Sequence, residues 1–166
     1  MREKLLLRGG RVLDPSQDLD GVREVLLVDG VVAALAEQIA APEDARIVDC
    51  TTHSQESSWF TTAPIGAINK LLEKTGWTRD DVDLFEVNEA FAVVTMAAMK
   101  DIGIDHDRMN VHGGACALGH PVGASGARII ATLYHALAKN GLTRGVASLC
   151  IGGGEATAIG IERLAA

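Results

Sequence analysis

Two pairs of short apolar runs open the chain, and each pair is separated by a dipeptide suited to a tight turn. One dipeptide is Gly9-Gly10 and the other is Asp29-Gly30. Both suit the two-residue turns of β-hairpins, which require positive φ angles. The apolar runs that flank them are 5–7, 12–13, 25–28 and 31–35. The pattern therefore predicts two β-hairpins in the first part of the chain.

A polar stretch at 51–58 ends this pattern and predicts a domain boundary. Before it, residues 40–45 are expected to form a loop and residues 46–48 a third short strand. A segment of hairpins this small is not stable by itself and must pack on something else. We therefore divide the chain into a β-hairpin segment at 1–50 and a second domain at 51–166.

After the boundary the apolar residues recur at the spacing of helices. A helix is predicted over 65–75, with Pro64 in its first turn and Gly76 at its end. A strand follows at 82–87, and a helix at 89–102 is apolar on nearly every side, so it should be largely buried. The remaining predicted elements are a short strand at 109–112, a helix at 125–139 and strands at 146–151 and 155–161. This order predicts an α/β fold, with helices layered on a mixed sheet.

Charge and composition exclude several classes of protein. Fifteen Lys and Arg against 22 Asp and Glu give a net charge of −7, which disfavours binding to nucleic acid or to an anionic membrane. No apolar stretch approaches the length of a membrane span, and the run at 5–7 is too short for a signal peptide. The three cysteines share no C-x-x-C spacing, so neither a disulfide framework nor a zinc site is expected. We expect a cytoplasmic protein with no metal.

Three segments place reactive side chains at turns. Asn88 lies where a predicted strand meets a helix, a common ligand-binding position in α/β sheets, although it could simply cap the helix. His120 lies in a glycine-rich turn before the helix at 125–139, where a neutral imidazole could accept a proton or donate to an oxyanion. Cys150 ends a strand before three glycines. Its thiol would need a polarising neighbour to react, and otherwise it is a small core residue.

These segments resemble the C-terminal part of a thiolase, the acetyl-CoA C-acetyltransferase family. The resemblance covers residues 51–163 and rests on three motifs. They are NEAF beginning at Asn88, GGACALGHPVGASGAR beginning at Gly113, and CIGGG beginning at Cys150. The fold that the resemblance implies is an incomplete thiolase-like C-terminal layer of helices on a mixed sheet, preceded by the β-hairpin segment.

The resemblance also implies a role for each site residue. His120 would polarise a nucleophilic cysteine and, with a water held on Asn88, bind a thioester oxyanion. Cys150 would carry the proton of the α-carbon, and the backbone at Gly152 would contribute to a second oxyanion hole. Ala90 and Phe91 would border the pantetheine of a coenzyme A thioester, which would be the substrate, with no bound cofactor.

Thiolases acylate a cysteine in their N-terminal half, and no such half is recognisable in this chain. Residues 4–50 instead resemble the opening strands of a dihydroorotase-type amidohydrolase, through LRGGRVLD from Leu7, VDG from Val28 and IVD from Ile47. That family places an H-x-H metal motif soon afterwards, and this sequence contains none. The chain is thus expected to be a fusion of two partial domains.

Two main hypotheses follow. The first is a thiolase-type acyltransferase, incomplete by itself, that needs an oligomeric partner or a complementary thiolase chain to supply the nucleophile. The second is a non-catalytic fusion or interaction protein in which the thiolase residues are relics. It predicts exposed apolar surface around the helix at 89–102. A residual amidohydrolase is the third and weakest reading, which tight zinc binding would revive.

Overall fold

The computed structural model describes residues 4–39 and 46–163, without the side chains of residues 46–48. The chain forms two compact units, Met1–Cys50 and Thr51–Ala165. Strand β4 (Arg46–Ser54) begins in the first unit and ends in the second. The loop predicted at 40–45 lies outside the described residues.

The first unit is built on an antiparallel sheet in which β1 pairs with β2 and β2 with β3. The first residues of β4 pair with β1 in parallel. The bounds are β1 Lys4–Asp14, a 3₁₀ turn η1 Pro15–Gln17, β2 Leu19–Val28 and β3 Val31–Ala36. The predicted hairpin at Asp29-Gly30 is confirmed, because both residues adopt positive φ, 52° and 78° respectively.

The hairpin predicted at Gly9-Gly10 is wrong. Strand β1 continues through both glycines, with a register shift between Leu7 and Gly10. Gly9 has a φ of 72°, so its positive dihedral produces a β-bulge and not a chain reversal. The reversal comes later, at η1, where Asp14 accepts hydrogen bonds from the backbone N–H and the hydroxyl of Ser16.

The second unit carries a mixed sheet with the strand order β4-β7-β6-β5. Strand β6 is parallel to β5 and antiparallel to β7. The bounds are β5 Leu84–Val87, β6 Arg144–Ile151 and β7 Glu155–Glu162. The structure therefore has the predicted α/β class, and the strands predicted at 82–87, 146–151 and 155–161 are all present.

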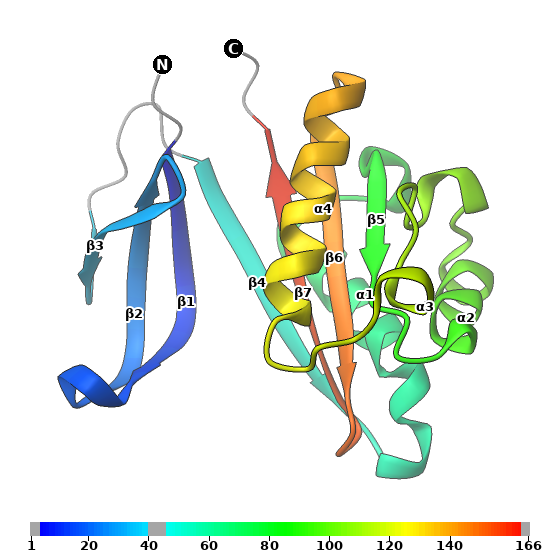
Figure 1. Ribbon diagram of the computed structural model, residues 1–166, viewed down its shortest axis with the longest axis horizontal. Coiled ribbons are helices and arrows are strands. Elements are labelled where there is room, and N and C mark those ends of the chain that lie inside the picture. Colours follow the sequence, from blue (N-terminus) through cyan, green and yellow to red (C-terminus); the bar gives the residue numbers. More distant parts are fainter. Residues whose placement is uncertain (1–3, 40–45, 164–166) are drawn as a thin grey trace. The chain divides into compact units, whose positions relative to one another are not determined.

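Helices cover both faces of this sheet, and Figure 1 shows α4 on the near face with α1 behind it. The helices are α1 Ala63–Thr75, α2 Ala92–Ile102, α3 Ala115–Leu118 and α4 Ser125–Asn140, with 3₁₀ turns at Ser57–Thr62, Arg79–Asp81 and His106–Arg108. Alternate side chains of β5 point to opposite faces of the sheet. Phe85 and Val87 join the apolar core that includes α1 and α2, while Glu86 reaches α4.

The helix predicted at 65–75 and the one predicted at 125–139 are confirmed as α1 and α4. Pro64 lies in the first turn of α1, where its missing N–H costs nothing. Gly76 ends α1 with a φ of 71°, and its N–H bonds back to the last turn of the helix. Gly141 ends α4 in the same way, with a φ of 66°.

Two other predictions for this unit need correction. Helix α2 begins at Ala92 and not at residue 89, and it is not buried all round, since Val93 is 53% and Met96 61% exposed. Residues 109–112 do not form a strand. Met109 makes a single bridge to Phe85, and Asn110 then adopts a φ of 48° that turns the chain away from the sheet.

Candidate active site

Asn88 is held rigidly at the carboxyl end of β5. It follows Val87, which is paired with Ser148 on the neighbouring parallel strand, and its own N–H donates to the Ser148 carbonyl at 2.9 Å. The residue is completely buried. Carboxyl ends of parallel strands meet at one edge of a sheet, so Asn88 presents its amide where ligands commonly bind.

His120 meets Asn88 from the loop that precedes α4. The Asn88 Nδ2 atom lies 3.4 Å from Nε2 and 3.5 Å from Nδ1 of the His120 ring. Nδ1 is 2.6 Å from the hydroxyl of Ser125, the first residue of α4. The same hydroxyl lies 3.1 Å from the Pro121 carbonyl, which also accepts from the backbone N–H groups of Ala124 and Ser125. Ser125 thus holds the Nδ1 edge of the His120 ring at the start of α4.

Arg128 bridges Asn88 to a buried carboxylate. One arm of its guanidinium donates from Nη1 to Glu86 Oε1 at 2.8 Å, and the other donates from Nη2 to Asn88 Oδ1 at 3.1 Å. Glu86 is only 2% exposed. Burial raises its pKa to about 7, even though the adjacent Arg128 charge acts in the opposite direction.

A second carboxylate fixes the glycine-rich loop. Glu89 accepts from the Asn110 amide at 3.0 Å and from the Cys116 backbone N–H at 2.9 Å. Partial burial acts to raise the pKa of Glu89, but these hydrogen bonds outweigh it and the pKa is lowered. Asn110 also exchanges two hydrogen bonds, both 2.8 Å long, with the backbone of Val87. The strand that carries Asn88 is thereby tied to the loop that leads to His120.

Cys150 lies near this edge but is turned toward the core. It is two residues beyond Ser148 on β6, and it belongs to the apolar cluster beneath α1 and α2. The residue is 8% exposed, and burial raises the pKa of its thiol. Among the described residues, no hydrogen bond joins the Cys150 thiol to the His120 ring. The structure brings Asn88 and His120 together and leaves Cys150 as a protonated neighbour.

The turn after Cys150 is set by a glycine at its far end. Gly154 has a φ of 101°, and its carbonyl accepts from the Gln55 N–H at 3.0 Å. A Cβ on Gly154 would come within 3.0 Å of the Ser57 Cα, so only glycine fits. Gly152, the expected oxyanion-hole residue, is exposed within this turn.

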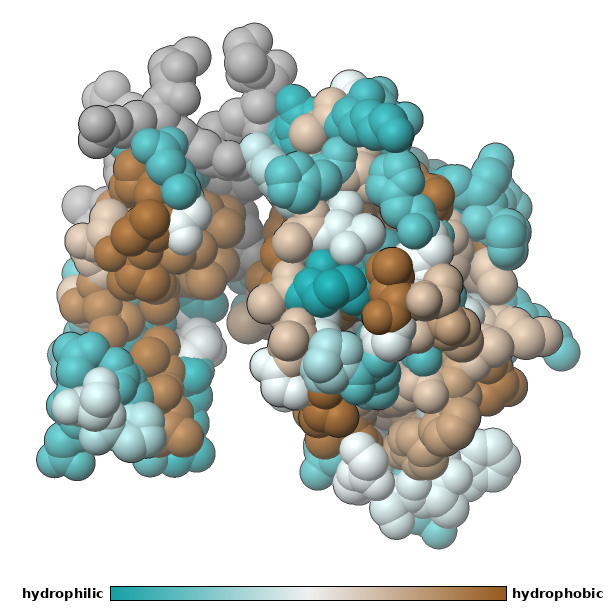
Figure 2. All heavy atoms as spheres, viewed as in Figure 1, coloured by the Kyte–Doolittle hydropathy of each residue, from teal (hydrophilic) through white to brown (hydrophobic). Residues whose placement is uncertain are grey.

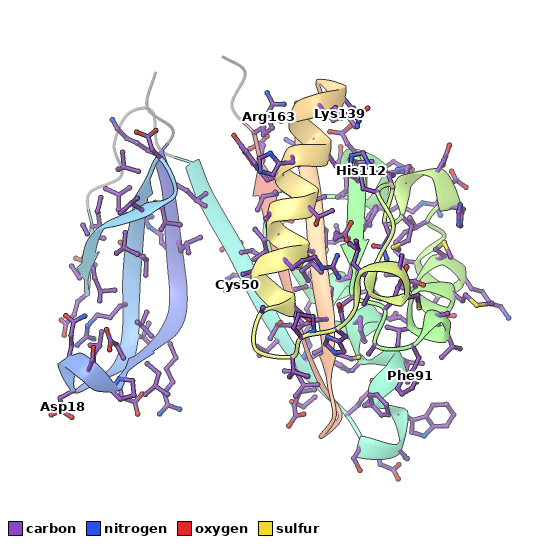
Figure 3. The ribbon with its side chains drawn as sticks, in the orientation of Figure 1. Asp18, Cys50, Phe91, His112, Lys139 and Arg163 are labelled. Atoms are coloured by element: carbon purple, nitrogen blue, oxygen red, sulfur yellow. The ribbon has the colours of Figure 1, made fainter. Side chains whose placement is uncertain are left out.

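The two expected substrate-binding residues lie in the loop before α2. Ala90 is partly buried and packs on the apolar core. Phe91, which is labelled in Figure 3, is 58% exposed. Its ring meets that of Phe60 edge to face at 6.2 Å between centroids. An exposed aromatic ring anchored by a neighbour is a suitable surface for the apolar part of a ligand.

The remaining cysteines and histidines do not form a further site. Within residues 4–39 and 46–163 no group of three or more His, Cys, Asp or Glu side chains is placed to hold a metal ion. The described helices include none long and apolar enough to cross a membrane. Cys50 is partly buried and Cys116 is exposed.

Sequence reasoning missed the residues that orient the site, namely Glu86, Glu89, Asn110, Ser125 and Arg128. One signal was available, because Glu86 interrupts the otherwise apolar strand LFEV, and a buried carboxylate requires a partner. Arg128 follows Ser125 by three residues on a helix, so both face the same side. Nothing in the local sequence identified Asn110, whose side-chain partners are 21 to 23 residues away in the chain.

Comparison with known proteins identifies the family in which these motifs occur. Residues 41–163 match the family model described as thiolase, C-terminal domain. Cytosolic acetyl-CoA acetyltransferase of Mus musculus is 51% identical over 119 residues, which are 72% of this chain and 30% of that protein. The probable acetyl-CoA acetyltransferase of Dictyostelium discoideum is 46% identical over 145 residues, 87% of this chain and 34% of its own length. The chain thus spans about a third of the curated relatives it matches.

Solved structures agree with the sequence comparison. The Bacillus anthracis acetyl-CoA acetyltransferase superposes with a TM-score of 0.68 at 43% identity, covering 69% of this chain and 29% of that one. The Acat5 thiolase of Ascaris suum, solved in complex with coenzyme A, gives a TM-score of 0.67 at 38% identity over 90% of this chain and 33% of its own. The predicted thiolase-like layer is therefore confirmed. These comparisons do not support the amidohydrolase resemblance of residues 4–50.

Proposed function

The chain belongs to the thiolase family, and from that premise we propose that it is the C-terminal part of an acetyl-CoA acetyltransferase-type enzyme that makes or cleaves carbon–carbon bonds between thioesters. The contact that carries this proposal is the one between Asn88 and His120, whose Nδ2 and Nε2 atoms are 3.4 Å apart. With the ring proton on Nδ1, Nε2 can take a proton from a nucleophilic thiol. The resulting imidazolium and the Asn88 amide can then both donate toward a thioester oxygen as it gains negative charge.

Cys150 is proposed as the proton carrier of the condensation. Its thiolate would remove a proton from the α-carbon of one acetyl thioester, leaving an enolate whose oxygen is stabilised by Asn88 and His120. The enolate carbon would then attack an acyl group held on the cysteine of the missing N-terminal part. As the new carbon–carbon bond forms, the acyl carbon–sulfur bond breaks and its electrons leave on that cysteine sulfur, with the backbone of Gly152 stabilising the tetrahedral oxyanion.

The raised pKa of Cys150 favours the thiol at neutral pH. This protonation state suits the cleavage direction, in which Cys150 returns a proton to the departing enolate. For condensation the thiolate must form, so a polarising group has to approach the sulfur. We propose that assembly with the missing part of the protein provides that environment.

A coenzyme A thioester is the proposed substrate, with Ala90 and Phe91 along its pantetheine arm. Support comes from the exposed, anchored ring of Phe91 and from the Ascaris suum thiolase, which was solved with coenzyme A. We further propose a cytosolic location, in line with the name of the Mus musculus relative. For residues 4–50, an origin from an amidohydrolase remains a prediction, and stoichiometric zinc binding by this chain would support it.

Complementation tests the proposed function. The chain is mixed with the separately produced N-terminal part of the Bacillus anthracis acetyl-CoA acetyltransferase, the portion that it does not cover, and thiolysis of acetoacetyl-CoA is followed. We expect activity in the mixture, none in either part alone, and loss of activity with His120→Ala or Cys150→Ala. If no thiolysis occurs although the two parts co-elute, the proposal is wrong.

The second candidate function is a non-catalytic interaction protein. The observation that favours it is the exposed apolar surface formed by Phe91, Val93 and Met96 in and before α2. A partner that docks there would bury these side chains whether or not chemistry follows. Co-elution with the thiolase part, combined with the absence of thiolysis, would support this reading over the enzymatic one.

A further inference from the structure

We propose that Arg128 and Glu86 are positioning residues that fix which way the Asn88 side-chain amide faces. The inference rests on the proposed function for its purpose, since an oxyanion needs the amide N–H and not the amide oxygen. The contacts from which it is argued do not depend on that function. It concerns a chain of side chains that begins in the sheet at Glu86 and ends at His120.

The guanidinium of Arg128 settles the orientation because it has donors and no acceptor. Its Nη2 atom is 3.1 Å from Asn88, and only the amide oxygen can accept that hydrogen bond. The amide nitrogen must then point the other way. It lies 3.4 Å from Nε2 of His120.

The position of the His120 ring fits this arrangement. The Asn88 nitrogen is 3.4 Å from Nε2 and 3.5 Å from Nδ1, so it is nearly equidistant from both ring nitrogens and close to the Cε1 atom between them. The ring is held there by the 2.6 Å contact between Nδ1 and the Ser125 hydroxyl. The Asn88 amide protons are therefore neighbours of the ring because the amide oxygen faces Arg128.

Glu86 holds the other arm of Arg128. The carboxylate is almost completely buried and lies 2.8 Å from Nη1. The Nε atom of Arg128 is buried and has no hydrogen-bond partner among the described residues, so the two Nη contacts alone fix the plane of the guanidinium. A two-armed contact is what arginine provides and lysine does not.

Arg128→Lys tests the proposal in the full chain without changing net charge. A lysine ammonium keeps the positive charge and favours the charged carboxylate of Glu86, so Asn88 loses its donor. Nuclear Overhauser contacts between the Asn88 amide protons and the His120 Hε1 proton are expected in the natural chain, because the amide nitrogen lies close to Cε1. In Arg128→Lys these contacts should be weakened or lost, because the amide is then free to flip. Glu86→Gln, which keeps an acceptor for Nη1, should retain them.

Contacts of unchanged strength in Arg128→Lys would overturn the proposal. Should Arg128→Lys not fold, the natural chain decides, since the absence of these contacts there contradicts the proposed orientation. Both measurements use this chain alone. They therefore give their answer whether or not the complemented protein catalyses thiolysis.

Discussion

Gly114 leaves the space that the Glu89 carboxylate occupies, since a Cβ added to Gly114 would lie 2.5 Å from both carboxylate oxygens. That carboxylate accepts hydrogen bonds from the Cys116 N–H and the Asn110 amide. These bonds fix the loop that leads to His120. The absence of one side chain therefore permits the hydrogen bonds that order this loop.

Gly114→Ala should displace Glu89 and lower the free energy of unfolding of the second unit by about 1–3 kcal/mol. Both tryptophans, Trp59 and Trp77, lie in that unit, so urea denaturation followed by tryptophan fluorescence measures it. Gly126→Ala is the matched control. No atom lies within 4 Å of its added Cβ and it is helical, so it should be neutral or slightly stabilising. Equal stability of the two variants would contradict the role given to Gly114.

The stability of the second unit should fall as pH rises from 4.5 to 7. Below pH 4.5, the ordinary pKa of glutamic acid, Glu86 is protonated in both the folded and the unfolded chain. Above its folded pKa of about 7 it is ionised in both, and folding must bury the charge. The loss is on the order of 3 kcal/mol or less. Urea denaturation at several pH values should show this slope in the natural chain and a flatter profile in Glu86→Gln.

Glu89→Gln is the control for this pH dependence. The pKa of Glu89 is lowered by its hydrogen bonds despite partial burial, so its contribution has the opposite sign and is lost at low pH. The slope between pH 4.5 and 7 should persist in Glu89→Gln. Its disappearance there, or its persistence in Glu86→Gln, would show that another group is responsible.

Ser125→Ala should release the His120 tautomer. In ¹⁵N spectra of the ring, the natural chain is expected to show one tautomer, fixed by the contact between Nδ1 and Ser125, and the variant a mixture of both forms. The variant should also lose about 1 kcal/mol of stability, because it lacks the buried hydroxyl that contacts Nδ1 and the Pro121 carbonyl. Ser148→Ala is the control, since Ser148 is equally buried and its hydroxyl bonds to the Thr157 carbonyl. A similar loss of stability without any change in tautomer is expected there.

Cys150 should react slowly with iodoacetamide at neutral pH. Its burial limits access, and its raised pKa reduces the fraction of thiolate. In Cys50→Ser/Cys116→Ser, which leaves only Cys150, alkylation at pH 7.5 should be at least about tenfold slower than in the urea-unfolded chain. Cys50→Ser/Cys150→Ser reports the exposed Cys116 for comparison. Rapid alkylation of Cys150 in the folded chain would mean that the thiol is already activated without a partner.

The apolar residues of α2 should make the isolated chain self-associate. Val93 and Met96 are three residues apart, lie on one helix face and are both more than half exposed. Val93→Glu/Met96→Glu should reduce the association measured by sedimentation velocity. Ala131→Glu/Ala138→Glu adds the same charge at exposed positions of α4 and should reduce it less. A natural chain that is monomeric at high concentration would remove the basis for docking at α2.

Apolar surface is not confined to the second unit. Figure 2 shows brown side chains across the visible face of the β1–β3 sheet, and the exposed ones include Val22, Val31 and Val32. If Val93→Glu/Met96→Glu leaves the association unchanged, Val31→Glu/Val32→Glu is the next variant to measure. The two results together assign the self-association to one unit.

Local rules predicted the elements whose ends depend on single residues. Pro64 and Gly76 delimited α1, and Asp29-Gly30 marked a hairpin, because each has a backbone preference that acts within one turn. The same rule wrongly predicted a turn at Gly9-Gly10, because a positive φ is compatible with a β-bulge as well as with a turn. The start of α2 was missed because Asn88 is held by the neighbouring strand and does not cap the helix.

The reactive side chains were more predictable than the groups that orient them. Asn88, His120 and Cys150 were identified from their motifs, and the first two are in contact. The orienting groups come from distant segments, since Glu86 and Arg128 are 42 residues apart and meet only because β5 and α4 pack together. Cys150 pairs with Ala156 of β7 and lies in the apolar cluster, and this environment depends on packing that no local pattern reveals.

Ser125 and Arg128 stand three residues apart on the opening turn of the same helix, so one rigid rise of about 4.5 Å carries the anchors of both the imidazole and the amide. Their spacing is set by helix geometry. Any fraying of this turn would therefore misalign the ring and the amide together.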